Sequence, residues 1–188
     1  MRRIFATVLV SLLSAASADA TSVLRLEREE LARRATRVFE GTVVDVRGER
    51  DAGGRIATRV RFAVEADGWW KGTGGGAVEL LLPGGILEAE ERALLVPGMP
   101  RFERGERAVV FASEATRGGE TLAIPVGLKQ GKLRVVLTPN GRRALERELS
   151  GLQLVDPATR EVNAAPRGPE RFDYDAWKAA VRRIAEER

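Results

Sequence analysis

The chain has 188 residues, of which 44% are hydrophobic and 31% charged, and its formal net charge is +4. This length and balance indicate one globular domain that can bury a core without metal or disulfide support. Cysteine and histidine are absent, which excludes disulfides, thiol nucleophiles, imidazole bases and metal sites built from either residue. The basic excess is mainly arginine, and we interpret it as genome composition rather than as a nucleic-acid surface.

Residues 1–20 have the three parts of a secretory signal peptide. Arg2 and Arg3 give a positively charged start, residues 4–16 are apolar, and the sequence ends in small residues around Asp19. We therefore expect cleavage near Ala20 and a periplasmic or secreted mature chain. The apolar run is too short for a transmembrane anchor. The alternative is a buried N-terminal helix.

Residues 21–35 are expected to form a helix, with Thr21 or Ser22 as its N-cap and acidic residues in its early turns. The segments after it have strand character, because they are rich in β-branched residues or alternate between apolar and polar side chains. They are Arg37–Arg47, Arg55–Glu65, Ala77–Leu82, Arg107–Ala112, Leu122–Val126 and Lys132–Leu137. Gly41, inside the first of them, is expected to mark a bulge or coil that lets a small barrel close.

The stretch 97–111 (PGMPRFERGERAVVF) is expected to form the corner around which the strands are organised. It begins with a proline and glycine turn and places an aromatic anchor at Phe102. A tight turn around Gly105 then leads into a strand in which Val109 and Phe111 share one face.

After residue 141 the sequence predicts a different kind of structure. Residues 142–149 are expected to form one or two helical turns, and residues 156–169 a polar loop or linker. The last segment, 173–188, predicts an amphipathic helix capped by Asp173. We expect this helix to dock on the barrel, with a membrane-surface or partner-binding role as the alternative.

These elements predict a mainly β fold. We expect a small antiparallel Greek-key barrel of five or six strands, OB-like, with an N-terminal helix and a C-terminal amphipathic helix. A β-sandwich is the alternative. The expected organisation is a signal peptide (1–20), a barrel domain (21–141) and a C-terminal extension with the terminal helix (142–188).

Motifs within residues 31–137 resemble those of a group of uncharacterised exported bacterial proteins. The motifs are VxxGxVxxV at Val38–Val46, IxTxVxFxV at Ile56–Val64, Trp70-Lys71-Gly72, Pro83-Gly84-Gly85, Pro97-Gly98, Pro100-Arg101-Phe102, Gly105-Glu106 and Gln130-Gly131-Lys132. The resemblance implies an exported, OB-like barrel similar to the tissue-inhibitor (netrin-like) fold. Some relatives lie ahead of matrixin-like metalloprotease domains. The resemblance supplies no catalytic residues.

One departure from the tissue inhibitors affects function. Those inhibitors chelate the protease zinc through an N-terminal cysteine, whereas the expected mature chain begins with Thr21 and contains no cysteine. Inhibition by that route is therefore excluded. The sequence also lacks an H-E-x-x-H motif, so the chain is not itself such a protease.

The candidate binding surface consists of Arg59 and Arg61, on the outer face of the second strand, with Trp69, Trp70 and Lys71 beside them. Cations interleaved with aromatic rings on an OB-like sheet can stack bases and hold phosphates. The alternative, which we favour, is that the tryptophans fill and shield the barrel end while the arginines form a solvated face. Nucleic acid is not the expected partner of an exported protein. A protein or an anionic envelope polymer can use the same residues.

The sequence assigns no catalytic residue, metal site or cofactor. Glu88, Glu90 and Glu91 lack the spacing of a calcium loop and predict a solvated acidic loop. The glycine-rich stretch 72–76 lacks the Lys-Ser/Thr of a phosphate loop. We therefore expect an exported, non-enzymatic binding or interaction module of the envelope or extracellular space. The alternatives are an accessory or inhibitor of an exported metalloprotease, or a weak hydrolase.

Overall fold

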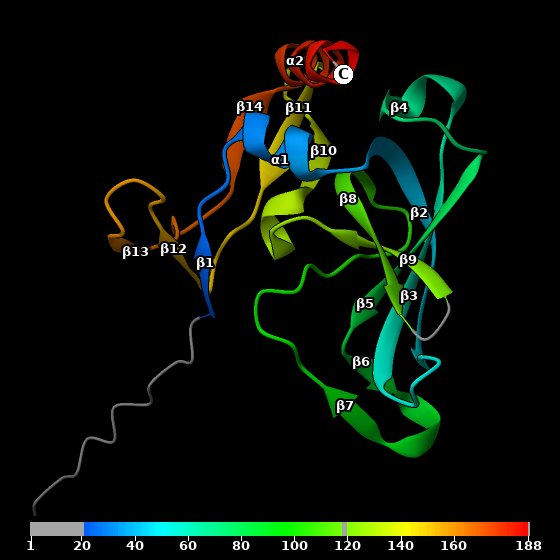
Figure 1. The fold of residues 1–188 in the computed structure, drawn as a ribbon. Coiled ribbons are helices and arrows are strands. Elements are labelled where there is room, and N and C mark those ends of the chain that lie inside the picture. Colours follow the sequence, from blue (N-terminus) through cyan, green and yellow to red (C-terminus); the bar gives the residue numbers. More distant parts are fainter. Residues whose placement is uncertain (1–20, 118–119, 188) are drawn as a thin grey trace, which may run out of the picture.

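The computed structural model describes residues 21–117 and 120–187. The signal peptide expected at residues 1–20 lies outside these described residues. The described chain is mainly β, with strands arranged around a barrel and helices gathered at one end of it (Figure 1).

Five strands of the described chain close into a barrel. They are β2 (Arg37–Arg50), β3 (Ile56–Ala63), β5 (Ala77–Pro83), β8 (Arg107–Arg117) and β9 (Glu120–Pro125). Pairing runs β2-β3-β5-β9-β8, and β8 pairs with β2 to complete the ring. Counted along the chain, this order is first, second, third, fifth and fourth, the Greek-key connectivity of an OB fold. The predicted OB-like barrel is confirmed, except that β5 and β9 run parallel.

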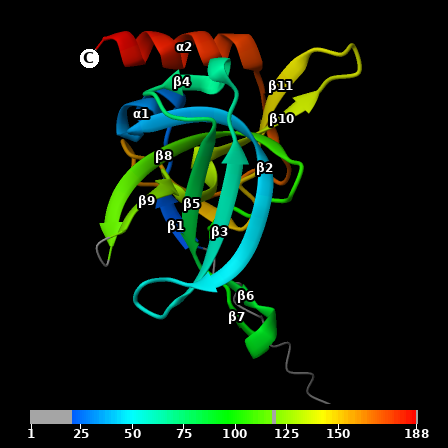
Figure 2. The ribbon, with the colours of Figure 1, turned by 90° about the vertical axis from the view of Figure 1, so that its right-hand side faces the viewer.

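Strand β2 bends strongly as it passes from one side of the barrel to the other (Figure 2). Its register with β3 shifts between Val43 and Asp45, which is the geometry of a β-bulge. Gly41 lies close by, and a Cβ atom there would lie 2.9 Å from the carbonyl oxygen of Ala63. The bulge expected at Gly41 therefore occurs two to four residues later, while Gly41 allows the close approach of β3.

The corner at residues 97–111 forms as predicted. Phe102 is buried, and its ring meets that of Phe62 edge-on at 5.3 Å between centroids. The turn around Gly105 is closed by the Glu106 N–H, which donates to the Glu103 carbonyl at 3.0 Å. Beyond the turn the chain enters β8.

Residues 108–112 of β8 are buried on both faces of the strand. Ala108, Val110 and Ala112 face the interior of the barrel, where they pack with residues of β2, β3 and β5. Val109 and Phe111 face the opposite way, into a second core beneath the helices. The prediction that these two residues share a face is confirmed, and the unbroken apolar run over residues 108–112 is explained because this part of the strand has no solvent-facing side.

The second edge of β8 is divided between two partners. Residues 112–117 pair with β9, and residues 108–110 pair with β10 (Lys132–Leu137). A short 3₁₀ helix, η3 (Leu128–Gly131), lies between β9 and β10. The sheet leaves the barrel at this point and continues through β11 (Arg143–Arg147) to β14 (Glu170–Asp173).

The two α-helices of the described chain, α1 (Arg28–Arg34) and α2 (Tyr174–Glu186), lie together at one end of the barrel (Figure 1). As predicted, Asp173 caps α2, since its carboxylate accepts the Ala176 N–H at 2.8 Å. The apolar face of α2 is buried in the second core, so the predicted docking of this helix is confirmed. On the same side, the 3₁₀ helix η1 (Ala66–Gly68) leads into β4 (Trp69–Lys71), which pairs with β2.

The helix predicted over residues 21–35 is wrong in its first half. Thr21–Leu24 form strand β1, which pairs in parallel with β12 (Leu152–Val155), and α1 begins only at Arg28. The buried Gln130 side chain holds the connection extended, because it accepts the Leu26 N–H at 2.8 Å and donates to the Leu24 carbonyl at 2.9 Å. Thr21 and Ser22 are therefore not caps. Glu27 occupies the N-cap position without a side-chain capping hydrogen bond, and its carboxylate instead accepts from Arg25 Nε at 2.8 Å.

The helical turns predicted over residues 142–149 are also wrong. This segment contains β11, which lies between β10 and β14. Two of its charged residues, Glu146 and Arg147, are buried and paired: Glu146 contacts Arg134 and Arg171, and Arg147 contacts Glu170. The helix propensity of the Ala, Leu, Glu and Arg residues is overridden by strand partners on both edges. The loop expected over residues 156–169 contains one short strand, β13 (Val162–Ala164), paired with β12.

A hairpin projects from the end of the barrel opposite the helices (Figure 2). It consists of β6 (Gly85–Leu87) and β7 (Arg92–Leu94), joined through the 3₁₀ turn η2 (Glu88–Glu90). The hairpin crosses β2 so closely that a Cβ atom at Gly48 would overlap the Ile86 carbonyl group. The Thr58 hydroxyl fixes its start by donating to the Gly84 carbonyl at 2.7 Å.

The close crossing at Gly48 gives a first prediction. We expect Gly48→Ala to lower the free energy of unfolding by about 1–3 kcal/mol, because the new methyl group forces the hairpin away from β2. Gly75→Ala is the matched control, since a Cβ at Gly75 meets nothing within 4 Å. Urea unfolding followed by tryptophan fluorescence measures both changes. Equal stabilities for the two variants would contradict the packing described here.

Candidate functional site

The predicted arginines lie on the outer face of β3. Arg59 contacts two carboxylates on neighbouring strands, Glu49 at 2.7 Å and Glu79 at 3.0 Å. Arg61 lies two residues further along the same face and is exposed. This part of the barrel surface therefore carries charges of both signs, and Arg59 already forms two ion pairs there.

The predicted aromatic and lysine residues, Trp69, Trp70 and Lys71, form the short strand β4 near the helices. Trp69 packs on Phe39 with ring centroids 5.8 Å apart, and Trp70 is buried against Tyr174. Lys71 is 7% exposed, and its ammonium group donates to backbone carbonyls at the C-terminal end of α1. Trp70 and Lys71 thus contact the helices that cover them. A binding role for the five predicted residues stays a prediction.

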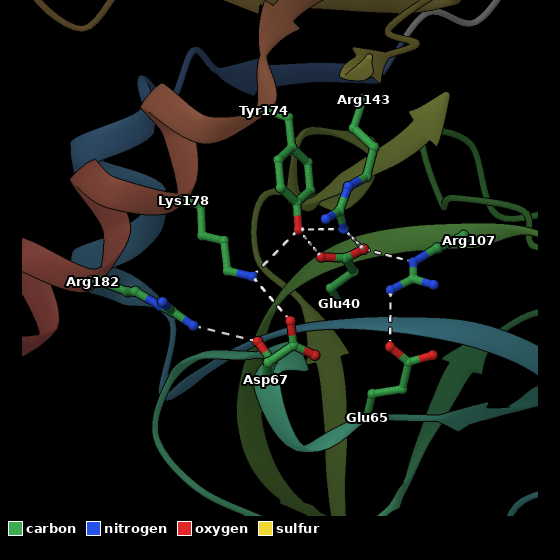
Figure 3. A network of polar contacts seen from close by, with 8 residues as sticks. All are labelled: Glu40, Glu65, Asp67, Arg107, Arg143, Tyr174, Lys178 and Arg182. Carbon is green, nitrogen blue, oxygen red and sulfur yellow. Dashed lines mark hydrogen bonds and ion pairs between the residues drawn. The ribbon is translucent and has the colours of Figure 1, made fainter. Parts of the chain in front are cut away.

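A buried polar network connects the barrel to α2 at this end (Figure 3). Its centre is Glu40 of β2, whose side chain is 1% exposed. One carboxylate oxygen accepts from Arg107 Nε at 2.6 Å and lies 3.5 Å from Arg143 Nη1. The other accepts the hydroxyl of Tyr174, the first residue of α2. We call these four residues the Glu40 network.

Further contacts extend the Glu40 network to the surface. Lys178 Nζ lies 3.4 Å from the Tyr174 hydroxyl oxygen and 3.8 Å from the Asp67 carboxylate. Arg182 donates to the Asp67 carbonyl at 3.3 Å, and Arg107 reaches Glu65 at 3.3 Å (Figure 3). Residues from β2, β8, β11, η1 and α2 are therefore connected through one group of charges.

The electrostatics of the Glu40 network favour a structural role. Burial, as the larger effect, and the hydrogen bond to Glu40 both raise the pKa of the Tyr174 phenol well above its ordinary value. The phenol therefore stays protonated at neutral pH and serves as a donor, not as a base or nucleophile. The hydrogen bond with Glu40 also raises the pKa of Arg107. The network holds α2 on the barrel through charge-assisted hydrogen bonds.

An apolar groove lies at the opposite end of the molecule, between the β6–β7 hairpin and the segment that leads to Phe102. We call it the hairpin groove. Its volume is about 710 Å³. Its apolar lining residues are Val46, Leu82, Pro83, Ile86, Leu94, Leu95, Val96, Pro97, Met99, Pro100 and Phe102, and its charged lining residues are Arg47, Glu88, Arg101 and Lys129.

Exposed apolar side chains gather around this groove. Six large apolar side chains are exposed in the described chain, and three of them belong to the hairpin and the residue after it. They are Ile86, Leu94 and Leu95, with 61%, 44% and 70% of their surface exposed. Sequence reasoning missed them because it interpreted the segment around Glu88, Glu90 and Glu91 as a solvated acidic loop. The sequence signal that could have identified them is the presence of apolar residues within a segment that is otherwise rich in glutamate.

A second hollow, of about 910 Å³, lies beside the hairpin groove. We call it the charged hollow. Its charged lining residues are Arg101, Glu103, Arg104, Glu106, Arg107, Lys129, Lys132, Arg134, Glu146 and Glu148. Pro100, Arg101 and Lys129 line both hollows and thus form a ridge between them. An apolar surface and a charged surface are therefore adjacent.

Comparisons of the chain with models of protein families, with curated proteins and with solved structures found no match. The functional interpretation therefore depends on the geometry and chemistry of the molecule itself. Within residues 21–117 and 120–187, neither helix has the length and apolar character needed to cross a bilayer.

The Glu40 network gives a second prediction. We expect Tyr174→Phe to lower the free energy of unfolding by about 1.5–3 kcal/mol at neutral pH, because a hydrogen bond to a buried carboxylate is lost. The pKa of the phenol is higher in the folded state. Its stabilising contribution is therefore present below about pH 10 and is lost as the pH rises further.

Tyr174 is the only tyrosine in the chain, so phenolate absorbance reports on it alone. In an alkaline titration of the folded protein, we expect ionisation above the usual tyrosine pKa of about 10, together with unfolding. Tyr174→Phe should show a smaller loss of stability over the same pH range. A phenol that titrates near its ordinary pKa while the protein stays folded would contradict the burial of this group.

Proposed function

We propose that the protein is an exported, non-enzymatic binding module that holds a protein partner at the hairpin groove. The observation that supports this most strongly is the gathering of Ile86, Leu94 and Leu95 around a hollow of about 710 Å³. Contiguous exposed apolar surface of this kind is typical of protein interaction sites. The export part of the proposal depends on the signal peptide expected at residues 1–20.

Burial of these side chains by a partner supplies a driving force for binding. Transfer of one leucine or isoleucine side chain out of water stabilises a complex by about 1.5–3 kcal/mol. Such anchors act most strongly when they enter a packed pocket surrounded by polar residues. Arg47, Glu88, Arg101 and Lys129 line the hairpin groove in this way.

The hairpin is held rigidly, which lowers the entropic cost of binding. Gly48 permits a close crossing with Ile86, and Thr58 bonds to the Gly84 carbonyl. At the tip, Arg50 Nε donates to Glu90 Oε1 at 3.0 Å and ties η2 to the end of β2. Ile86 and Leu94 therefore lie on a supported element rather than on a loose loop, and Leu95 follows it directly.

The apolar lining favours a protein over an anionic polymer as the partner, because a polyanion gains little from leucine and isoleucine side chains. The two other functions considered from the sequence, an accessory or inhibitor of a metalloprotease and a weak hydrolase, stay predictions. The first is compatible with a protein-binding groove. No observation favours the second.

A pull-down from an envelope extract of the source organism tests the proposal. The baits are the mature protein, the groove variant Ile86→Ser/Leu95→Ser, and the control variant Leu24→Ser/Val162→Ser. Leu24 and Val162 are also exposed, at 40% and 56%, and neither lines the hairpin groove or the charged hollow. We expect one or more proteins to be retained by the mature protein and the control variant.

For any protein retained in this way, we expect the groove variant to lower the affinity about tenfold or more, because two apolar anchors are lost. Surface plasmon resonance with the isolated partner measures this change. Equal retention by the groove variant and the mature protein would show that the hairpin groove is not the binding site. Retention of nothing by any bait would count against a protein partner.

A further inference from the structure

The ridge between the two hollows carries two cations that form no ion pair with a described carboxylate, although Lys129 helps to lower the pKa of Glu148 in the charged hollow. Arg101 is exposed, and its guanidinium group has no hydrogen bond or ion pair within the described residues. Lys129 is half-buried, and its ammonium group donates to the Ser150 carbonyl at 2.8 Å without an ion pair to any described acidic residue. A ligand that carries negative charge would therefore complement both cations.

Four neighbouring cations differ from these two, because each has a carboxylate partner, whereas Arg104 of the charged hollow has none within the described residues. Lys132 lies 2.7 Å from Glu106, Arg134 lies 2.7 Å from Glu146, and Arg107 bonds to Glu40. Arg47, on the other side of the groove, lies 3.2 Å from Glu49. The cations without an ion pair are thus the two on the ridge, beside the apolar lining, and Arg104 in the charged hollow next to it.

We infer that the partner presents a polypeptide segment in which an apolar anchor is followed or preceded closely by aspartate or glutamate. The anchor occupies the hairpin groove and contacts Ile86 and Leu95, while the carboxylates lie over Arg101 and Lys129. This inference rests on the proposed function and adds the chemistry of the partner to it. The supporting argument is charge complementarity at the edge of an apolar site.

A polypeptide fits this surface better than a lipid or a second copy of the chain. Strand β7 is the outer strand of a two-stranded sheet, and no described strand pairs with its free edge. That edge offers backbone N–H and C=O groups to an extended segment, which a lipid chain cannot use. A second copy carries the same positive net charge, which the cationic ridge does not favour.

The ridge acts on specificity more than on affinity. Exposed ion pairs contribute little to binding because water and salt screen them. The same cations repel a segment whose apolar anchor is flanked by lysine or arginine. The apolar anchor therefore supplies most of the affinity, and the ridge selects acidic sequences among the apolar ones.

Selection from a random peptide library displayed on phage tests this inference with the mature protein as bait. Three variants are selected in parallel. The first is the groove variant Ile86→Ser/Leu95→Ser, and the second is the ridge variant Arg101→Glu/Lys129→Glu. The third is a charge-matched control, Arg142→Glu/Arg167→Glu, at two exposed arginines that line neither hollow.

We expect the mature protein and the charge-matched control to enrich peptides that combine apolar residues with nearby aspartate or glutamate. The ridge variant should instead enrich apolar peptides flanked by lysine or arginine. For individual acidic peptides, fluorescence anisotropy should show binding to the ridge variant weakened at least about fivefold, with a smaller difference at high salt.

Two negative outcomes separate this inference from the proposed function. Enrichment that depends on Ile86 and Leu95 but shows no acidic preference, or is unchanged in the ridge variant, overturns the inference and leaves the binding groove in place. If the mature protein enriches no sequence above the groove variant, the groove is not a peptide site, and both the proposed function and the inference fail.

Discussion

Strand β8 constrains the rest of the structure because almost none of its surface between residues 107 and 112 is left free. Its alternate residues enter two different cores, with Val110 in the barrel and Phe111 beneath the helices. One edge pairs with β2 and the other with β10 and then β9. The barrel and the helical layer therefore share a single strand, and their relative position follows from the alternation of its side chains. A polar substitution at either set of positions would place an unpaired group in an apolar core.

The two ends of the molecule are built on different physical principles. At the helical end, Glu40 brings charges into a buried position where each has a partner, and the hydrogen bonds hold α2 in one orientation. Such networks stabilise little in net terms but specify geometry. At the hairpin end, by contrast, Leu95 and Ile86 keep most of their surface in water. The structure thus combines a closed end that needs no further contact with an open end that gains from one.

The barrel was predictable from the sequence because local patterns and long-range contacts agree there. The alternation in Ile56–Val64 and the cap at Asp173 each depend on residues close in the chain. Residues 142–149 were not predictable, since their strand exists only because β10 and β14 lie on either side. Local sequence patterns also do not predict that Trp70 and Lys71 lie under α1 and α2, or that Leu95 is exposed to water. Exposure is a property of the assembled chain, so a binding surface built from it escapes local pattern reasoning.

The pairing of β1 with β12 has a consequence for the order of folding. Ser22 and Gln153, which bond through their side chains, are separated by 131 positions in the chain. The first strand of the described chain therefore has no partner until almost the whole polypeptide is available, and closing so long a loop costs conformational entropy. The hairpin of β2 and β3 joins neighbouring residues and can form early. Residues 21–27 are thus among the last to become ordered, and until then they are open to any protease that the chain meets.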